Sequence, residues 1–155
     1  MTLDDITIVI ATFNSDKKIG NCLDSIGGKC KVIIVENSNN KNFKSEIEKR
    51  YSNVSCIIAN DNLGYSKSNN LGLSKALTRY CLILNPDTIL EKDTLENFIL
   101  SAEKNSNFAI LGPLLYQGKK HSLELNDQVE VENLKGFAMF LNMQKFEKIG
   151  FFDEN

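Results

Sequence analysis

Short, uninterrupted runs of apolar residues recur along the chain and predict strands that are buried on both faces. The four clearest runs cover residues 6–11, 32–35, 54–58 and 80–84. Each run is followed by polar residues, and this combination is typical of the strands of a parallel sheet. Two later segments, residues 108–116 and 136–141, also have a strand-like pattern, although Gly112-Pro113 interrupts the first of them.

Between these runs, apolar residues recur at the spacing of amphipathic helices. The positions are Ile19, Cys22, Leu23 and Ile26; Phe43, Ile47 and Tyr51; Leu71, Leu73, Ala76 and Leu77 within a helix expected over 66–79; Leu95, Phe98, Ile99 and Ala102; and Phe146 and Ile149. A regular alternation of strands and helices implies parallel strands joined by right-handed crossovers, with helices on both faces of the sheet. We therefore expect a three-layer α/β fold with a mostly parallel sheet, formed by residues 1–155 as one domain.

Polar side chains follow each of the first four predicted strands. Asn14 follows the first, Glu36 the second and Asp87 the fourth, while the third continues into a loop with Asn62 and Gly64. Because the carboxyl ends of parallel strands lie along one edge of a sheet, these residues are expected to lie close together, where α/β proteins bind ligands. The segment Asn85-Pro86-Asp87 by itself is better explained by an ordinary turn, since Pro and Asp are common turn residues, and the ligand interpretation depends on the other strand ends.

Composition and charge narrow the function classes. The chain has 18 Lys and Arg residues against 20 Asp and Glu, a formal net charge of −2, which argues against a general nucleic-acid-binding surface. No apolar stretch approaches the roughly 20 residues that span a bilayer, and Asp4-Asp5 makes the N-terminus acidic where a signal peptide is basic. We therefore expect a cytoplasmic protein without a transmembrane segment. The four cysteines show no Cys-x-x-Cys spacing and are predicted to be buried free thiols.

The strand-end residues have the chemistry to hold a nucleotide, although the glycine-rich dinucleotide motif and the P-loop motif are both missing from the sequence. Glu36 can accept hydrogen bonds from a ribose hydroxyl or a base N–H, and Thr12 and Asn14 can contact a base edge. Asp87 is an oxygen ligand suited to Mg²⁺ or Mn²⁺, which bridges diphosphates.

Six segments, taken together and in order, resemble the family 2 glycosyltransferases, and the Asn-Pro-Asp form is similar to the rhamnosyltransferase-like branch of that family. The segments are Ile8-Val9-Ile10-Ala11-Thr12-Phe13-Asn14, Cys22-Leu23-Asp24-Ser25-Ile26, Ile33-Ile34-Val35-Glu36-Asn37-Ser38, Asn62-Leu63-Gly64-Tyr65, Asn69-Asn70-Leu71-Gly72 and Leu84-Asn85-Pro86-Asp87-Thr88. Gly136-Phe137-Ala138-Met139 and Gly150-Phe151-Phe152-Asp153-Glu154 follow them. The resemblance covers nearly all 155 residues and implies the glycosyltransferase A-type fold.

The resemblance also implies a role for each site residue. Thr12 and Asn14 would lie beside the donor nucleotide, and Glu36 stands where the family usually has an aspartate that contacts the base or ribose. Asp87 matches the last aspartate of the family's metal motif and would bind Mg²⁺ or Mn²⁺, with Asn85 in place of the first acidic residue. Asn62 and Gly64 match the loop that lines the donor cleft.

These correspondences imply a nucleotide-binding part over roughly residues 1–90 and the start of an acceptor part over roughly 108–155. Relatives continue into an acidic Glu-Asp-x-Asp motif that carries the catalytic base, so we expect the base beyond Asn155 and little or no sugar transfer by these 155 residues alone. We also expect strand 136–141 to be poorly covered, which would favour self-association through the C-terminal part.

The resemblance implies an inverting transferase that moves a sugar from a nucleoside-diphosphate sugar to a saccharide or lipid-linked acceptor, in bacterial cell-surface polysaccharide synthesis. Peripheral association with the inner face of the membrane is compatible with that role. A catalytically inactive module that binds nucleotide sugars is the alternative. A nucleotidyltransferase is disfavoured, because the early glycine-rich loop with Arg or Lys that such enzymes need is missing.

Overall fold

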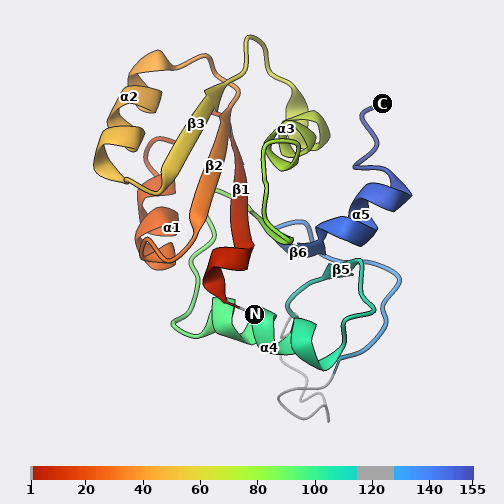
Figure 1. Ribbon diagram of the computed structural model, residues 1–155. Coiled ribbons are helices and arrows are strands. Elements are labelled where there is room, and N and C mark those ends of the chain that lie inside the picture. The colour runs from red at the N-terminus through yellow and green to blue at the C-terminus, as the bar shows by residue number, and fades with distance from the viewer. Residues whose placement is uncertain (1, 115–127) are drawn as a thin grey trace.

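The computed structural model describes residues 2–114 and 128–155, and within them six strands form one sheet in the order β3-β2-β1-β4-β6-β5 (Figure 1). The strands are β1 (Ile6–Thr12), β2 (Lys31–Glu36), β3 (Val54–Ile58), β4 (Tyr80–Leu84), β5 (Ile110–Leu111) and β6 (Ala138–Asn142). The α-helices are α1 (Ile19–Ile26), α2 (Lys41–Arg50), α3 (Gly64–Leu73), α4 (Thr94–Lys104) and α5 (Met143–Ile149), and a 3₁₀ turn (Leu3–Asp5) precedes β1.

The first four strands are parallel, as the sequence predicts. β1 lies between β2 and β4, with Thr12 opposite Glu36 and Ile10 opposite Leu84, and β2 pairs with β3. The C-terminal strands run the other way, since β6 is antiparallel to β4 and β5 is antiparallel to β6. The sheet is therefore mostly parallel with an antiparallel C-terminal edge.

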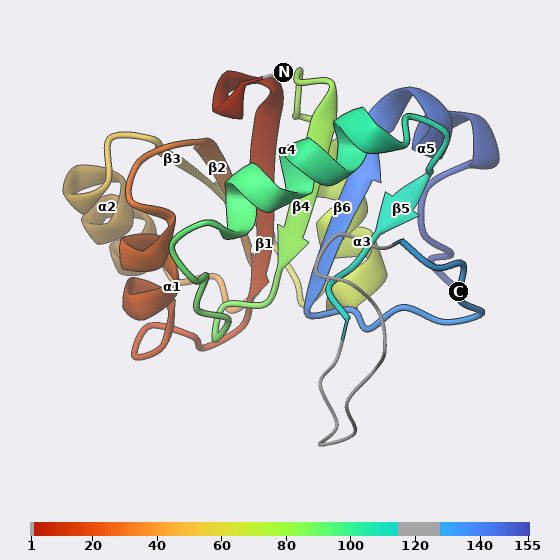
Figure 2. The ribbon, with the colours of Figure 1, turned by 90° about the horizontal axis from the view of Figure 1, so that it is seen from below.

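Helices cover both faces of the sheet, so the predicted three-layer arrangement is confirmed (Figures 1 and 2). Side chains of α1, α2 and α4 pack with Ile8, Ile34 and Leu82 in one core. Leu73 of α3 and Phe146 of α5 pack with buried strand residues in the second core, on the opposite face. β1 and β4 contribute residues to both cores, such as Ile8 and Val9 of β1, which explains why their apolar runs show no polar alternation.

The helix predicted over 66–79 is shorter than expected. α3 begins at Gly64 and ends at Leu73, and Leu77 is almost fully exposed. The chain must leave the helix early because β4 begins at Tyr80, opposite Ile6. The Thr78 hydroxyl stabilises the segment that leads into β4, since it lies 2.8 Å from both the Thr7 hydroxyl and the Tyr80 carbonyl oxygen.

The C-terminal part differs from the expectations in two ways. Of the strand-like segment 108–116, only Ile110–Leu111 pairs in the sheet, and residues 115–116 lie outside the described residues. The expectation that strand 136–141 is poorly covered is wrong, because every residue of β6 is buried. Phe140 stacks on the rings of Tyr80 and Phe98, so β6 is a central part of the core. Self-association through the C-terminal part stays a prediction.

The four cysteines are buried free thiols, as predicted. Burial, and then the nearby Asp87 carboxylate, raise the pKa of Cys22 to about 11, so this thiol stays protonated at neutral pH. Across residues 2–114 and 128–155, no helix combines the length and the apolar character that crossing a membrane requires.

Gly72 allows α3 to lie directly against β1. A Cβ at this position would come within 2.4 Å of Val9 Cγ1, so we expect Gly72→Ala to lower the free energy of unfolding by about 1–3 kcal/mol. Gly20, in α1, is the matched control, because its nearest neighbour, the Arg50 side chain, would lie 3.9 Å away. Urea unfolding should show Gly20→Ala to be neutral or stabilising by up to about 1 kcal/mol. Equal stability of the two variants would contradict the close packing of α3.

Candidate functional site

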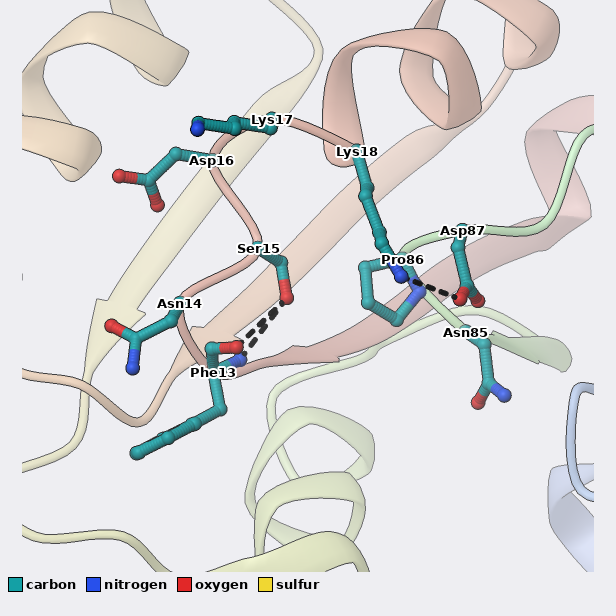
Figure 3. Close-up of a pocket in the computed structure, with 9 residues that line it drawn as sticks. All are labelled: Phe13, Asn14, Ser15, Asp16, Lys17, Lys18, Asn85, Pro86 and Asp87. Atoms are coloured by element: carbon teal, nitrogen blue, oxygen red, sulfur yellow. Dashed lines mark hydrogen bonds and ion pairs between the residues drawn. The ribbon is translucent and has the colours of Figure 1, made fainter.

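The carboxyl ends of β1, β2 and β4 lie at one edge of the sheet, and a pocket opens there between two loops (Figure 3). The pocket has a volume of about 600 Å³. Its lining, which we name the Asp87 pocket, consists of Phe13, Asn14, Ser15, Asp16, Lys17, Lys18, Asn85, Pro86 and Asp87. Ligand pockets commonly have this size and are lined by a mixture of aromatic and polar groups.

The first wall is the loop between β1 and α1, and Ser15 gives it its shape. The Ser15 hydroxyl accepts a hydrogen bond from the Phe13 N–H (3.3 Å) and lies 3.1 Å from the Phe13 carbonyl oxygen. The Ser15 carbonyl accepts hydrogen bonds from the N–H groups of Lys18 and Ile19 at the start of α1. Asn14 adopts a left-handed conformation with φ of 49°, which asparagine tolerates better than most residues. As a result the Phe13 ring stays 52% exposed at the pocket.

The second wall is the turn after β4. The Asn85 N–H donates to the Phe137 carbonyl (3.0 Å), and the Thr88 N–H donates to the Asn85 carbonyl (3.1 Å). These backbone bonds close the turn, so the Asp87 carboxylate is free to face the pocket. Its side chain is 55% exposed and its Oδ2 lies 3.5 Å from Lys18 Nζ. The turn interpretation and the ligand interpretation of Asn-Pro-Asp are therefore compatible in this structure.

Asp87 and Asn85 together fit a weak site for a hard divalent cation. Both line the pocket and offer side-chain oxygens, and Mg²⁺ commonly takes one or two carboxylates and completes its shell with phosphate and water. In the described part of the chain no group of three or more His, Cys, Asp or Glu side chains is placed to hold a metal ion. Any divalent ion here would therefore need further oxygen ligands, from water or from a bound phosphate group.

The other predicted site residues lie near this edge but do not line the pocket. Thr12 is buried, with its hydroxyl 3.4 Å from the Val35 carbonyl. Asn62 accepts a hydrogen bond from the Gly64 N–H (3.0 Å), and Gly64 begins α3 with φ of 73°. Of the seven predicted residues, the structure thus brings Asn14, Asn85 and Asp87 together in one pocket.

Glu36 is only 2% exposed, and its carboxylate is directed into its own loop. It accepts hydrogen bonds from the Ser38 N–H (2.8 Å), the Ser38 hydroxyl and the Asn40 N–H (2.8 Å). A direct contact between Glu36 and a base or ribose would compete with these bonds, and that contact stays a prediction.

Asn37 is a residue that the sequence analysis did not identify. Its Nδ2 donates to the carbonyl oxygens of Thr12 (3.1 Å) and Val35 (3.2 Å), and its Oδ1 accepts from the Leu63 N–H (3.1 Å) and the Ser68 hydroxyl (2.8 Å). This amide, 5% exposed, joins the ends of β1 and β2 to the start of α3. Only its place directly after a strand signalled a special role, and that place does not reveal its partners.

α3 also connects the two parts of the chain. The Tyr65 hydroxyl donates to the Gly136 carbonyl (2.6 Å), and the Asn70 side chain exchanges hydrogen bonds with the backbone of Phe152 (2.8 and 3.0 Å). Asn70 also donates to the Glu154 carboxylate (2.8 Å). A second hollow of about 470 Å³, which we name the α3 groove, lies here and is lined by Leu63, Lys67, Asn70, Leu71, Ser74, Phe151 and Glu154.

Comparison with known proteins identifies the family. The sequence pattern of glycosyl transferase family 2 matches residues 7–154. The chain belongs to glycosyl transferase family 2. A curated relative, the low-salt glycan biosynthesis hexosyltransferase Agl10 of Haloferax volcanii, is 23% identical over 184 residues, an alignment that covers 99% of this chain and 57% of Agl10.

Solved structures show that the family 2 chain has the glycosyltransferase A-type fold. TarS 1–349 of S. aureus in complex with UDP is similar with a TM-score of 0.74 and 18% identity, covering 99% of this chain and 51% of TarS 1–349. The mannosyltransferase PcManGT of Pyrobaculum calidifontis, in complex with GDP-Man and Mn²⁺, is similar with a TM-score of 0.75 and 12% identity, covering 100% of this chain and 50% of its own. The chain thus spans about half the length of these relatives.

Substitution of Asn37 tests whether its amide joins the ends of β1 and β2 to the start of α3. Asn37→Asp replaces its two donors by an oxygen that faces the Thr12 and Val35 carbonyls, so we expect a loss of about 2–4 kcal/mol in the free energy of unfolding. Asn105→Asp is the control, because the side chain of the exposed Asn105 accepts a hydrogen bond from the Asn107 N–H, and aspartate can accept it too. Urea unfolding of both variants measures the difference, and a small effect of Asn37→Asp would refute its connecting role.

Proposed function

We propose that this family 2 chain binds a nucleoside-diphosphate sugar in the Asp87 pocket and supports transfer of the sugar to a saccharide or lipid-linked acceptor. The observation that carries the proposal is the Asp87 carboxylate, exposed beside Asn85 in an open pocket at the carboxyl ends of β1 and β4. Open α/β sheets bind ligands at this edge. The complexes of TarS with UDP and of PcManGT with GDP-Man and Mn²⁺ support the same ligand class.

The pocket offers one group for each part of the donor. The half-exposed Phe13 ring gives the base a surface for stacking, because every base has an aromatic face. The exposed Asn14 amide can donate and accept hydrogen bonds at the base or ribose. Asp87, with Asn85, would hold a Mg²⁺ or Mn²⁺ ion at the diphosphate.

The residues behind the pocket position these groups. Glu36 holds the loop of residues 37–40, and Asn37 ties this loop to the ends of β1 and β2. Asn62 and Gly64 fix the start of α3 on the neighbouring side. We therefore assign Thr12 and Glu36 chiefly to the support of the pocket wall, with residues 1–90 as the donor-binding part and 108–155 as the start of the acceptor part.

Transfer would proceed with inversion. An acceptor hydroxyl, deprotonated by a carboxylate, attacks the sugar carbon, and the bond from that carbon to the nucleoside diphosphate breaks. A divalent ion bound at Asp87 would supply stabilisation of the negative charge on the leaving diphosphate. We place the base outside the Asp87 pocket and the chain within a rhamnosyltransferase-like branch that acts in cell-surface polysaccharide synthesis at the inner face of the membrane.

A donor-binding module without catalysis is the second candidate, and the placement of the last carboxylates favours it for the 155 residues by themselves. Glu154 accepts a hydrogen bond from Asn70 and lines the α3 groove, and Asp153 accepts from the Asn155 N–H. Neither belongs to the lining of the Asp87 pocket. An assay with UDP-, dTDP- and GDP-sugars separates the two candidates, because a transferase releases the nucleoside diphosphate together with a glycosylated acceptor.

The metal assignment makes a direct prediction. Titration of Mn²⁺ in the presence of UDP, dTDP or GDP should show binding that Asp87→Asn weakens on the order of 100-fold, because it removes the carboxylate ligand. Asp4→Asn serves as the control, since the exposed Asp4 lies before β1, at the opposite edge of the sheet, and should leave Mn²⁺ binding unchanged. If Asp87→Asn binds Mn²⁺ with unchanged affinity, Asp87 is not a metal ligand.

A further inference from the structure

Lys18 places an ammonium group where the proposed diphosphate would bind. Its Nζ lies 3.5 Å from Asp87 Oδ2, and its side chain extends from the start of α1 toward Asp87 (Figure 3). Lys17, the neighbouring residue, points away from Asp87 in the same view. Lys18 is therefore the lysine of the pocket lining that faces the Asp87 carboxylate.

This ion pair has little value for the stability of the fold. The Lys18 and Asp87 side chains are 66% and 55% exposed, and exposed pairs of this kind contribute about 0–1 kcal/mol. The pair joins two solvent-facing groups at the pocket rim, while the turn after β4 is already closed by backbone hydrogen bonds. The lysine can therefore leave Asp87 at little cost when another anion enters.

The charges of the pocket lining suggest that Lys18 helps to bind an anionic ligand. The lining contains two carboxylates, Asp16 and Asp87, and two ammonium groups, Lys17 and Lys18. Asp16 already accepts a hydrogen bond from Asn40 Nδ2 (3.2 Å), so Asp87 is the carboxylate that an incoming diphosphate would meet beside Lys18. Without a cation at this point, the Asp87 charge would repel the diphosphate.

We propose that Lys18 is a phosphate-binding residue that exchanges the Asp87 carboxylate for the diphosphate of the donor. The inference rests on the function proposed above, and adds a protein cation that acts beside the divalent ion. Asp87 and Asn85 would hold the divalent ion, which would supply part of the positive charge that the diphosphate needs. The Lys18 ammonium, 3.5 Å from Asp87 Oδ2, would supply a further positive charge from the protein.

The test measures binding to the 155-residue chain by calorimetry. The probes are UDP, dTDP and GDP, the matching nucleosides without phosphate, and Mn²⁺ alone, each nucleotide being tested in EDTA and in Mn²⁺. Lys18→Met removes the ammonium, and Lys18→Arg keeps the charge. Lys29→Met is the matched control, because Lys29 also forms a surface ion pair, with Glu96 at 2.9 Å. Lys29 follows the C-terminal end of α1, whereas Lys18 precedes its start.

We expect Lys18→Met to lower the affinity for the nucleoside diphosphate about tenfold in EDTA and in Mn²⁺, as the loss of a charge-assisted hydrogen bond does. Lys18→Arg should retain most of the affinity, and Lys29→Met all of it. Nucleoside binding should be unchanged in Lys18→Met, and binding of Mn²⁺ alone should be retained or stronger, because Lys18 no longer competes for Asp87.

Three results would overturn the inference. Wild-type affinity of Lys18→Met for the nucleoside diphosphate would overturn it while leaving the proposed function intact. An equal loss for the nucleoside would show that the substitution damages the pocket wall and not a phosphate contact. Failure of the wild-type chain to bind any of the three nucleoside diphosphates, with or without Mn²⁺, would overturn the proposed function together with the inference.

Discussion

The buried amide of Asn37 is the interaction on which the arrangement of the site depends. Its four hydrogen bonds hold the ends of β1 and β2 together and tie both to the start of α3. Parallel strands end in loops that have no ladder partners of their own, so their direction must be fixed by other contacts. A side-chain amide that satisfies two carbonyls and two donors does this at the edge where the pocket opens. Glu36 completes the support by holding the next residues of the same loop.

α3 connects the strand ends at the Asp87 pocket with the C-terminal part of the chain. Its start is held by Asn37 through Leu63 and Ser68, and its side is tied to Gly136 and Phe152 by Tyr65 and Asn70. Gly72 lets the helix lie directly on β1. α3 therefore connects the pocket edge with residues 136 and 152, in addition to the β4–β6 pairing and the hydrogen bond from Asn85 to Phe137.

The sequence predicted the features that follow from burial and chain direction. Tyr80–Leu84 is a central strand because nothing in it suits a solvated face, and Asp87 reaches the pocket because Asn85 and Pro86 turn the chain just after the strand end. The direction of individual polar side chains could not be predicted in the same way. Glu36 is the last residue of β2 and Asn14 follows the neighbouring β1, yet Glu36 turns inward to the N–H groups of its own loop while Asn14 lines the pocket.

Lys18 was missed for a related reason. It stands next to Lys17 at the start of a helix, and no spacing in the sequence distinguishes the two lysines. Only the path of α1 relative to the turn after β4 brings one of them to Asp87. The early end of α3 likewise depends on the position of β4 in the sheet, which lies outside the local sequence.

The central claim is that a nucleoside diphosphate binds at the carboxyl ends of β1 and β4. The most direct measurement is a two-dimensional ¹H–¹⁵N NMR titration of the chain with UDP, dTDP or GDP and Mg²⁺. The account predicts that the largest shifts fall on the amides of residues 13–18, 85 and 87, which line the Asp87 pocket. Shifts centred instead on Leu63, Leu71 and Phe151 would place the ligand in the α3 groove and contradict the account.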